Sequence, residues 1–200
     1  FKNLSFSVSR GDKIAFISEK HQAITTLFEI LHGKTSEYSG NFKFGTTIRH
    51  TYLPNNHDEY FHNKISIMDW LREFSEEKDD IYIRGFLGKM LFSGEEVLKS
   101  TQVLSGGEKV RCMLSKMMLL EGNVLIFDTP TNHLDLESIQ ALNNSMTNFA
   151  GTILFSSHDH ALTQSVANRI IEISPTNNYD KLMNYQEFIE YKRELKNTSA

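Results

Sequence analysis

Residues 124–135 read Val-Leu-Ile-Phe-Asp-Thr-Pro-Thr-Asn-His-Leu-Asp, and the fold class follows from this stretch and its surroundings. Four consecutive apolar residues that end in a carboxylate, Asp128, predict a short buried strand. The carboxyl ends of parallel strands face the crevice in which α/β proteins bind ligands. There Asp128 could hold Mg²⁺ through the water shell of the ion. Taken alone, Asp128 is more simply interpreted as a helix or turn cap.

Strand-like and helix-like patterns alternate on both sides of this stretch. Strands are predicted at residues 4–8, 13–17, 40–44, 48–53, 124–127, 152–156 and 169–173. Helices are predicted at residues 25–32, 66–74, 80–91, 105–120, 136–149, 161–168 and 185–195. Such alternation predicts an α/β protein whose mostly parallel sheet is covered by helices on both faces.

The domain organisation follows from where the alternation stops. Residues 55–100 carry helix-like stretches and no strand pattern. We therefore expect a single domain over residues 1–175, with a core built from 1–54 and 101–175 and an inserted helical subdomain. Residues 176–200 are expected to form a C-terminal extension or linker.

Composition excludes several classes of protein. The chain has 200 residues, of which 40% are hydrophobic and 23% charged, enough for a folded core and too apolar for disorder. A net charge of -4 disfavours binding to nucleic acid through a strongly basic surface. The single cysteine, Cys112, rules out a disulfide framework and a multi-cysteine zinc site, and it fits a reducing compartment.

Targeting segments are not evident. No apolar run approaches the roughly 20 residues of a membrane span, and no signal-peptide pattern is present. Phe1 directly precedes a strand-like pattern, so we expect the chain to be a piece of a longer polypeptide.

A second informative stretch, Leu-Ser-Gly-Gly-Glu-Lys at residues 104–109, precedes a long helical pattern. Without side chains, Gly106 and Gly107 let backbone N–H groups approach an anion closely. The helix N-terminus adds partial positive charge, and Ser105 adds a hydroxyl donor. The alternative is a plain loop in which Ser105 caps the helix and Glu108 completes a capping box.

A third stretch, Phe-Ser-Ser-His-Asp at residues 155–159, follows a predicted strand. His158, just past the strand end, could hydrogen-bond a phosphate or an attacking water. On its own, such a histidine is more often a cap or a surface residue.

The three stretches in this order resemble the ABC ATPase family, from about Leu4 to about Pro175. The resemblance implies a P-loop NTPase-like core with an inserted helical subdomain, and ATP and Mg²⁺ as cofactors. Asn-His-Leu-Asp at 132–135, together with Glu108, resembles the ABC-F class. Proteins of that class carry two ATPase domains on one chain and no membrane domain, and many act on ribosomes. The chain is therefore expected to be the second, C-terminal ATPase domain of a cytoplasmic ABC-F protein, with a second ABC domain and the ribosome as partners.

The phosphate-binding loop of the family departs from its pattern here. The expected Gly-x-x-x-x-Gly-Lys-Ser/Thr is Ser-Glu-Lys-His-Gln-Ala-Ile-Thr at residues 18–25. Ser18 and Ala23 replace the glycines that let N–H groups wrap a phosphate, and Ile24 replaces the lysine that neutralises it. Thr25, an expected Mg²⁺ ligand with Asp128, still matches. Thr26 follows it in the expected ATP-binding set.

Two further positions are altered. Thr129 stands where the family has the glutamate that acts as general base, and threonine cannot act as a base near neutral pH. Asn55 stands where the family has a glutamine, one methylene longer. His158 and Asp128 remain. The resemblance therefore implies a degenerate ATP site that binds Mg²⁺ and ATP weakly or not at all.

The residues that the opposite site needs are intact. ABC domains pair head to tail, and each ATP lies between the phosphate loop of one domain and the signature loop of the other. The resemblance therefore assigns the signature residues Ser105, Gly106, Gly107 and Glu108 to ATP held by a partner domain, and Asp135 to coupling of the two sites. Two alternatives stay open. One is the nucleotide-binding subunit of an ABC membrane transporter, docked through 55–100. The other is a structural pseudo-ATPase.

Overall fold

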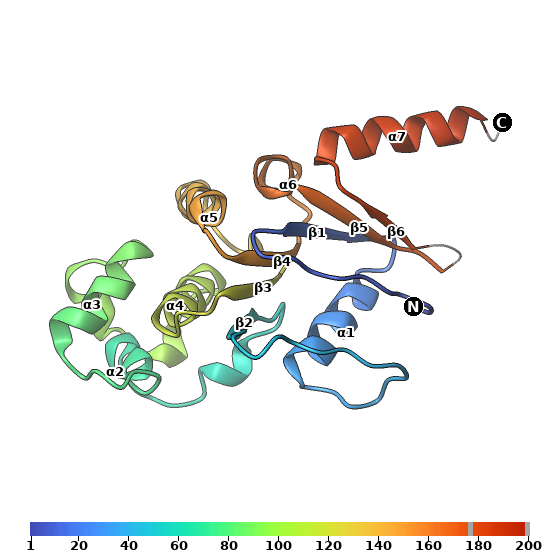
Figure 1. The fold of residues 1–200 in the computed structure, drawn as a ribbon. Helices are drawn as coiled ribbons and strands as arrows, with labels where there is room; N and C mark the ends of the chain where they lie inside the picture. Colours follow the sequence, from blue (N-terminus) through green and yellow to red (C-terminus); the bar gives the residue numbers. More distant parts are fainter. Residues whose placement is uncertain (176–177, 199–200) are drawn as a thin grey trace.

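The computed structural model describes residues 1–175 and 178–198, which fold around one six-stranded sheet (Figure 1). The strand order is β2-β3-β4-β1-β5-β6; the first five strands are parallel, and β6 pairs antiparallel with β5. The strands are β1 (Lys13–Ser18), β2 (His50–Leu53), β3 (Val124–Asp128), β4 (Thr152–Ser156), β5 (Arg169–Ile173) and β6 (Tyr179–Lys181). The expected α/β class with a mostly parallel sheet is confirmed.

Helices cover both faces of this sheet. One face carries α1, while α4, α5, α6 and α7 pack on the other (Figure 1). The helices are α1 (His21–His32), α2 (Ile67–Arg72), α3 (Asp80–Lys89), α4 (Gly106–Leu119), α5 (Leu136–Asn148), α6 (His160–Val166) and α7 (Tyr185–Thr198). Three short 3₁₀ turns complete the described elements: Asp58–Tyr60, Gly94–Leu98 and Thr101–Val103.

The sheet is buried on both faces, which explains why its strands read as continuous apolar runs. Along β1, Ile14 and Phe16 pack toward α1, whereas Ala15 packs into the cluster on the opposite face. Phe16 meets Phe28 of α1 edge to face, with ring centroids 5.3 Å apart. Burial on both sides is the pattern of parallel sheets.

The helical stretch 55–100 packs against α4. Its centre is Trp70, which is 2% exposed, stacks on Phe61 at 4.9 Å and donates its indole N–H to the Tyr60 carbonyl at 2.7 Å. Leu71 and Ile83 are fully buried beside it. A small apolar core therefore holds α2 and α3 on α4.

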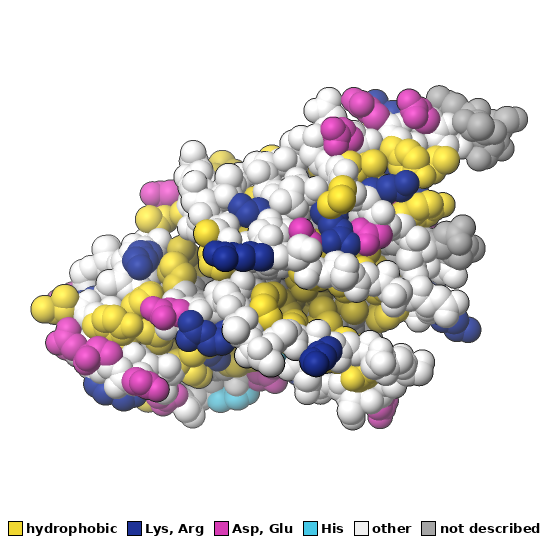
Figure 2. Space-filling model, viewed as in Figure 1, with side chains coloured by type: hydrophobic (Ala, Val, Ile, Leu, Met, Phe, Trp, Pro, Cys, Tyr) yellow, Lys and Arg dark blue, Asp and Glu magenta, His cyan; other side chains and the backbone are white. Residues whose placement is uncertain are grey.

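The expected strands at residues 4–8 and 40–44 are wrong. Neither segment pairs with a strand in the described residues, and an extended segment needs a partner for its backbone groups to become sheet. The two segments instead border an open apolar groove of about 1540 Å³, where Figure 2 shows hydrophobic side chains gathered in a hollow. Leu4, Phe6 and Phe44 pack from these segments onto the α1 side of the core.

The expected helix at 25–32 begins earlier, at His21. Its end is where the sequence places it, because Gly33 adopts the left-handed conformation (φ 81°) of a C-terminal cap. The remaining predicted helices and strands occur in the structure, with ends shifted by at most a few residues.

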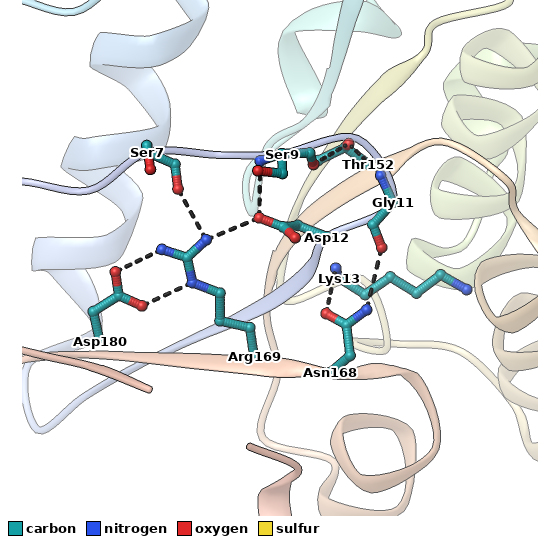
Figure 3. A network of polar contacts seen from close by, with 9 residues as sticks. All are labelled: Ser7, Ser9, Gly11, Asp12, Lys13, Thr152, Asn168, Arg169 and Asp180. Carbon is teal, nitrogen blue, oxygen red and sulfur yellow. Dashed lines mark hydrogen bonds and ion pairs between the residues drawn. The ribbon is translucent and has the colours of Figure 1, made fainter. Parts of the chain in front are cut away.

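Strand β6 was not anticipated, and Arg169 ties it to the start of β1 (Figure 3). The Arg169 guanidinium donates to Asp180 of β6 at 2.8 and 2.6 Å, to Asp12 at 2.8 Å and to the Ser7 carbonyl at 2.9 Å. Phe188 of α7 is also buried, at 4% exposure. The described part of 176–200, the segment expected as extension or linker, therefore packs on the core.

In the portion of the chain that the structure describes, every helix is too short or too polar to cross a membrane.

Candidate functional site

The carboxyl ends of β3 and β4 bring Asp128 and Ser156 side by side. The two residues are register partners, and the Ser156 hydroxyl donates to Asp128 Oδ1 at 2.9 Å. Asp128 is 1% exposed, so its carboxylate depends on protein donors.

Helix α1 supplies two more donors to the same carboxylate. The Thr25 hydroxyl donates to Asp128 Oδ2 at 2.7 Å, and Nε2 of His21 lies 2.8 Å from Oδ1. An ionised carboxylate offers about four acceptor positions, so about three of them are filled. Sequence analysis assigned Thr25 and Asp128 to this site and missed His21. What could have pointed to His21 is that a histidine stands within residues 18–25, the segment that the resemblance aligns with the phosphate-binding loop.

The connection from β1 to α1 is only Glu19 and Lys20, because α1 already begins at His21. The Ser18 hydroxyl donates to the Ile173 carbonyl at 2.8 Å, and the Ala23 N–H donates to the Lys20 carbonyl at 2.9 Å. These groups are thus engaged in hydrogen bonds within the protein.

The side chains of Ile24 and Thr26 are also engaged within the protein. Ile24 is 2% exposed and packs in the core with Phe28. The Thr26 hydroxyl donates to the Gln22 carbonyl within α1 at 2.8 Å. Neither residue supplies a cation or a free donor to a phosphate.

The fit to Mg²⁺ can be judged from the donors around Asp128. A hydrated Mg²⁺ needs accessible acceptor positions on its carboxylate ligand, but His21, Ser156 and Thr25 fill about three of the four, and the Asp128 side chain is fully buried. In the described residues, no group of three or more His, Cys, Asp or Glu side chains is arranged to hold a metal ion. As arranged, these residues do not fit the Mg²⁺ that the resemblance implies.

Thr129 follows Asp128 directly and Asn55 follows the end of β2, but the donors found on the Asp128 carboxylate are His21, Thr25 and Ser156. Thr129 is 4% exposed, and its hydroxyl donates to the Asp128 carbonyl at 2.8 Å, so it is turned toward the backbone. Asn55 is exposed beyond β2, with Oδ1 3.5 Å from Nδ2 of Asn132. Neither residue is placed to activate a water at Asp128.

His158 and His21 lie together, with ring centroids 5.3 Å apart. They line a pocket of about 200 Å³ together with His160 and Tyr185, whose hydroxyl is 2.5 Å from His160 Nδ1. His158 is therefore linked to Asp128 indirectly, because His21 contacts both residues.

The loop at 104–109 has the geometry of a capping box. The Ser105 hydroxyl accepts from the Glu108 N–H at 3.3 Å, and Glu108 Oε2 accepts from the Ser105 N–H at 2.7 Å. The capping interpretation is thus confirmed. Ser105 remains exposed at the N-terminus of the 14-residue α4, so capping does not remove it from a ligand's reach.

Lys99, in the helical stretch 55–100, forms an ion pair with Glu108, with Nζ 2.7 Å from Oε1. Burial by itself would raise the pKa of the Glu108 carboxyl, but the hydrogen bonds from Lys99 and Ser105 outweigh it and hold the pKa below its ordinary value. These hydrogen bonds therefore favour the ionised form of Glu108.

The two glycines pack against the turn that follows Asp128. A Cβ on Gly106 would lie 3.0 Å from the Cβ of His133, and one on Gly107 would lie 2.6 Å from the His133 carbonyl oxygen. His133 itself has a positive φ of 66°. Asp135 ends the turn as the cap of α5 and accepts from the Ser138 N–H at 2.8 Å, which holds the pKa of its carboxyl below the ordinary value. The turn at residues 129–135 therefore follows Asp128 and packs against Gly106 and Gly107 of the loop at 104–109.

Comparisons with known proteins agree with this architecture. A family model described as ABC transporter matches residues 1–132. YkpA of Bacillus subtilis, an ABC transporter ATP-binding protein, is 55% identical over 94% of this chain and 35% of its own length. ABC transporter F family member 5 of Arabidopsis thaliana is 29% identical over 95% of this chain and 28% of its own length. The energy-dependent translational throttle protein EttA of Escherichia coli is 28% identical over 96% and 35% of the two chains.

Solved structures share the fold. An inward-facing metal-chelate type ABC transporter superposes with a TM-score of 0.72 at 16% identity, covering 91% of this chain and 76% of that one. The chain spans about one third of the length of the curated relatives described above, at 35%, 28% and 35%.

Proposed function

The chain belongs to the ABC transporter family, and from this premise we propose that it is an ATP-binding cassette domain of the ABC-F class. It works beside a second such domain, whose ATP it contacts through its signature loop, Ser105 to Glu108. Its own nucleotide site is degenerate. The domain therefore contributes half of a working site and completes ATP hydrolysis in the partner.

The observation that carries this proposal is the state of the signature loop. Ser105 is exposed at the start of α4, and Gly106 and Gly107 present backbone at the same helix N-terminus. Helix N-termini bind anions because unpaired N–H groups and the helix dipole both favour negative charge. The capping box, Lys99 and His133 hold this loop in one geometry, as an anion site requires.

The degenerate state of the domain's own site is supported by the β1–α1 connection. Without glycines or a lysine, residues 18–25 lack both the backbone cradle and the positive charge that a nucleotide phosphate needs. Thr129 leaves the site without a general base. The two family residues left at this edge, Asp128 and His158, are too few for hydrolysis.

We further propose a role in translation, with the ribosome as the partner of the complete cytoplasmic protein. Support comes from the relative EttA, whose name describes a translational throttle, and from the F family relative. Binding of ATP between the two domains would draw them together, and hydrolysis would release them. Co-sedimentation of the full-length protein with ribosomes, with and without a non-hydrolysable ATP analogue, tests this role. Nucleotide-dependent co-sedimentation supports it, and its absence overturns it.

The decisive experiment for the signature loop is steady-state ATP turnover of the full-length protein with Ser105→Arg. Arginine at this exposed position blocks the approach of a phosphate. We expect turnover to fall about a hundredfold, the scale of losing an electrostatic contact to a reacting group. Ser93→Arg is the matched control, because Ser93 also forms a capping box, in the 3₁₀ turn at Gly94–Leu98.

The outcomes separate the alternatives. Loss of turnover in Ser105→Arg with full turnover in Ser93→Arg supports donation of the signature loop. Equal turnover in both variants contradicts it and leaves a structural pseudo-ATPase. Dependence of turnover on a membrane partner docked at residues 55–100 would instead favour a transporter subunit.

A further inference from the structure

His21 contacts the buried carboxylate of Asp128 from the solvent side: the His21 side chain is 25% exposed, and that of Asp128 is fully buried. We propose that His21 takes over the position of a divalent cation at Asp128, so that this domain's own site is permanently metal-free. The inference rests on the proposed function, since it explains how the domain keeps an idle site folded. It assigns to His21 the role of a positioning residue.

The first support is that protein donors reach both oxygens of Asp128. Asp128 receives His21 and Ser156 on Oδ1 and Thr25 on Oδ2, all within 2.7–2.9 Å. These donors come from α1 and β4, two elements that converge on the end of β3. Leaving a buried carboxylate without partners is costly, so a site that has lost its metal needs protein donors in its place.

The second support is the way the chain delivers His21. Only Glu19 and Lys20 separate β1 from α1, so that His21, the first residue of the helix, reaches Asp128 at the end of β3. Its side chain is 25% exposed, whereas that of Asp128 is fully buried. The imidazole therefore lies on the solvent side of the carboxylate. Its ring centroid is 5.3 Å from that of His158.

A chemical consequence follows. Removing the imidazole would vacate an acceptor position on Oδ1 and leave the oxygens of Asp128 and Thr25 together. Oxygen ligands of this kind suit hard divalent cations such as Mg²⁺ and Mn²⁺. The His21→Ala variant should therefore gain a cation site that the wild-type chain lacks.

The test counts Mn²⁺ bound to the nucleotide-free full-length protein by electron paramagnetic resonance of the free ion. We expect His21→Ala to bind about one Mn²⁺ per chain more than the wild type, because one carboxylate is freed. The gain should disappear in His21→Ala/Asp128→Asn. His160→Ala is the matched control: it removes another histidine of the same pocket that does not contact Asp128, and it should add no ion.

Three results would overturn the proposal: a folded His21→Ala without the extra ion, the same gain in His160→Ala, or a gain that survives Asp128→Asn. Should His21→Ala fail to fold, the wild type alone decides. Asp128→Asn must then leave its Mn²⁺ count unchanged, and a fall would show that Asp128 already holds metal. The count needs no nucleotide turnover, so its failure is distinguishable from a failure of the Ser105→Arg experiment.

Discussion

Gly107 lies against the backbone of His133, so close that a Cβ at residue 107 would come within 2.6 Å of the His133 carbonyl oxygen. The glycine is therefore required by packing inside the domain, in addition to any role toward a phosphate. Since the 129–135 turn starts at Asp128, this contact joins the site at Asp128 to the loop at residues 104–109.

The contact predicts the effect of Gly107→Ala. The new methyl must displace the backbone of the turn, because a carbonyl oxygen cannot swing away as a flexible side chain can. We expect a loss of about 1–3 kcal/mol in the free energy of unfolding, the usual cost of overpacking, measured by urea denaturation.

Gly85→Ala is the matched control for that variant. Gly85 lies within α3 and is exposed, and apart from its own helix backbone no atom lies within 4 Å of the position that a Cβ would take. Alanine there should raise stability by about 0.5–1 kcal/mol, because glycine is a poor helix former. Equal effects at residues 85 and 107 would refute the packing account.

Arg169→Met tests the network that fastens β6 to the start of β1. The substitution keeps the apolar stem but leaves Asp12 and Asp180 without their common partner. We expect a loss of about 3 kcal/mol, the low end for a broken buried ion pair, because the Asp180 side chain is 36% exposed. Arg84→Met, which removes a single hydrogen bond to the Gly94 carbonyl, should change stability little. Similar losses in both variants, by urea denaturation, would contradict the assignment.

Glu108 predicts a pH dependence of stability. Its folded-state pKa lies below the ordinary value, so its contribution is present above the unfolded pKa and is lost as the pH falls through the folded pKa. Glu108→Gln keeps the capping hydrogen bond but removes the charge. Wild type should exceed this variant by about 0.3–1 kcal/mol at neutral pH, and the difference should vanish in acid. A difference that does not change with pH would exclude the charge as its cause.

Ile24→Lys shows whether the lost lysine can simply be restored. Ile24 is 2% exposed and packs with Phe28, so a lysine there buries an unpaired charge in an apolar core. We expect destabilisation of several kcal/mol with no gain in ATP binding, against about 1 kcal/mol for Ile24→Val. Nucleotide binding gained by Ile24→Lys would mean that the loop is less altered than its packing indicates.

Most of the fold could be predicted from local patterns. The apolar runs at 13–17, 124–127 and 152–156 became strands because a sheet buried on both faces needs such runs. The glycine cap at residue 33 and the capping box at residue 105 were also correct, since both depend on short-range chemistry.

The misses share a physical cause, which is dependence on distant partners. Residues 4–8 alternate like a strand, but pairing decides whether they become one. Strand β6 is held in place by the ion pair between Arg169 and Asp180, a contact that no local sequence pattern reveals. At the candidate site, Asp128 could be named from its place at a predicted strand end and Thr25 from the family resemblance, whereas His21 could not, because its role depends on the short β1–α1 connection.

The central claim is that ATP meets this domain at the signature loop and not at its own degenerate loop. The most direct measurement is photo-crosslinking of the full-length protein with ATP carrying a photoreactive group on its γ-phosphate, followed by peptide mapping. The account predicts labelling of the peptide that contains residues 105–109 and none of the peptide that contains residues 18–25. Labelling of residues 18–25, or none at residues 105–109, would contradict it.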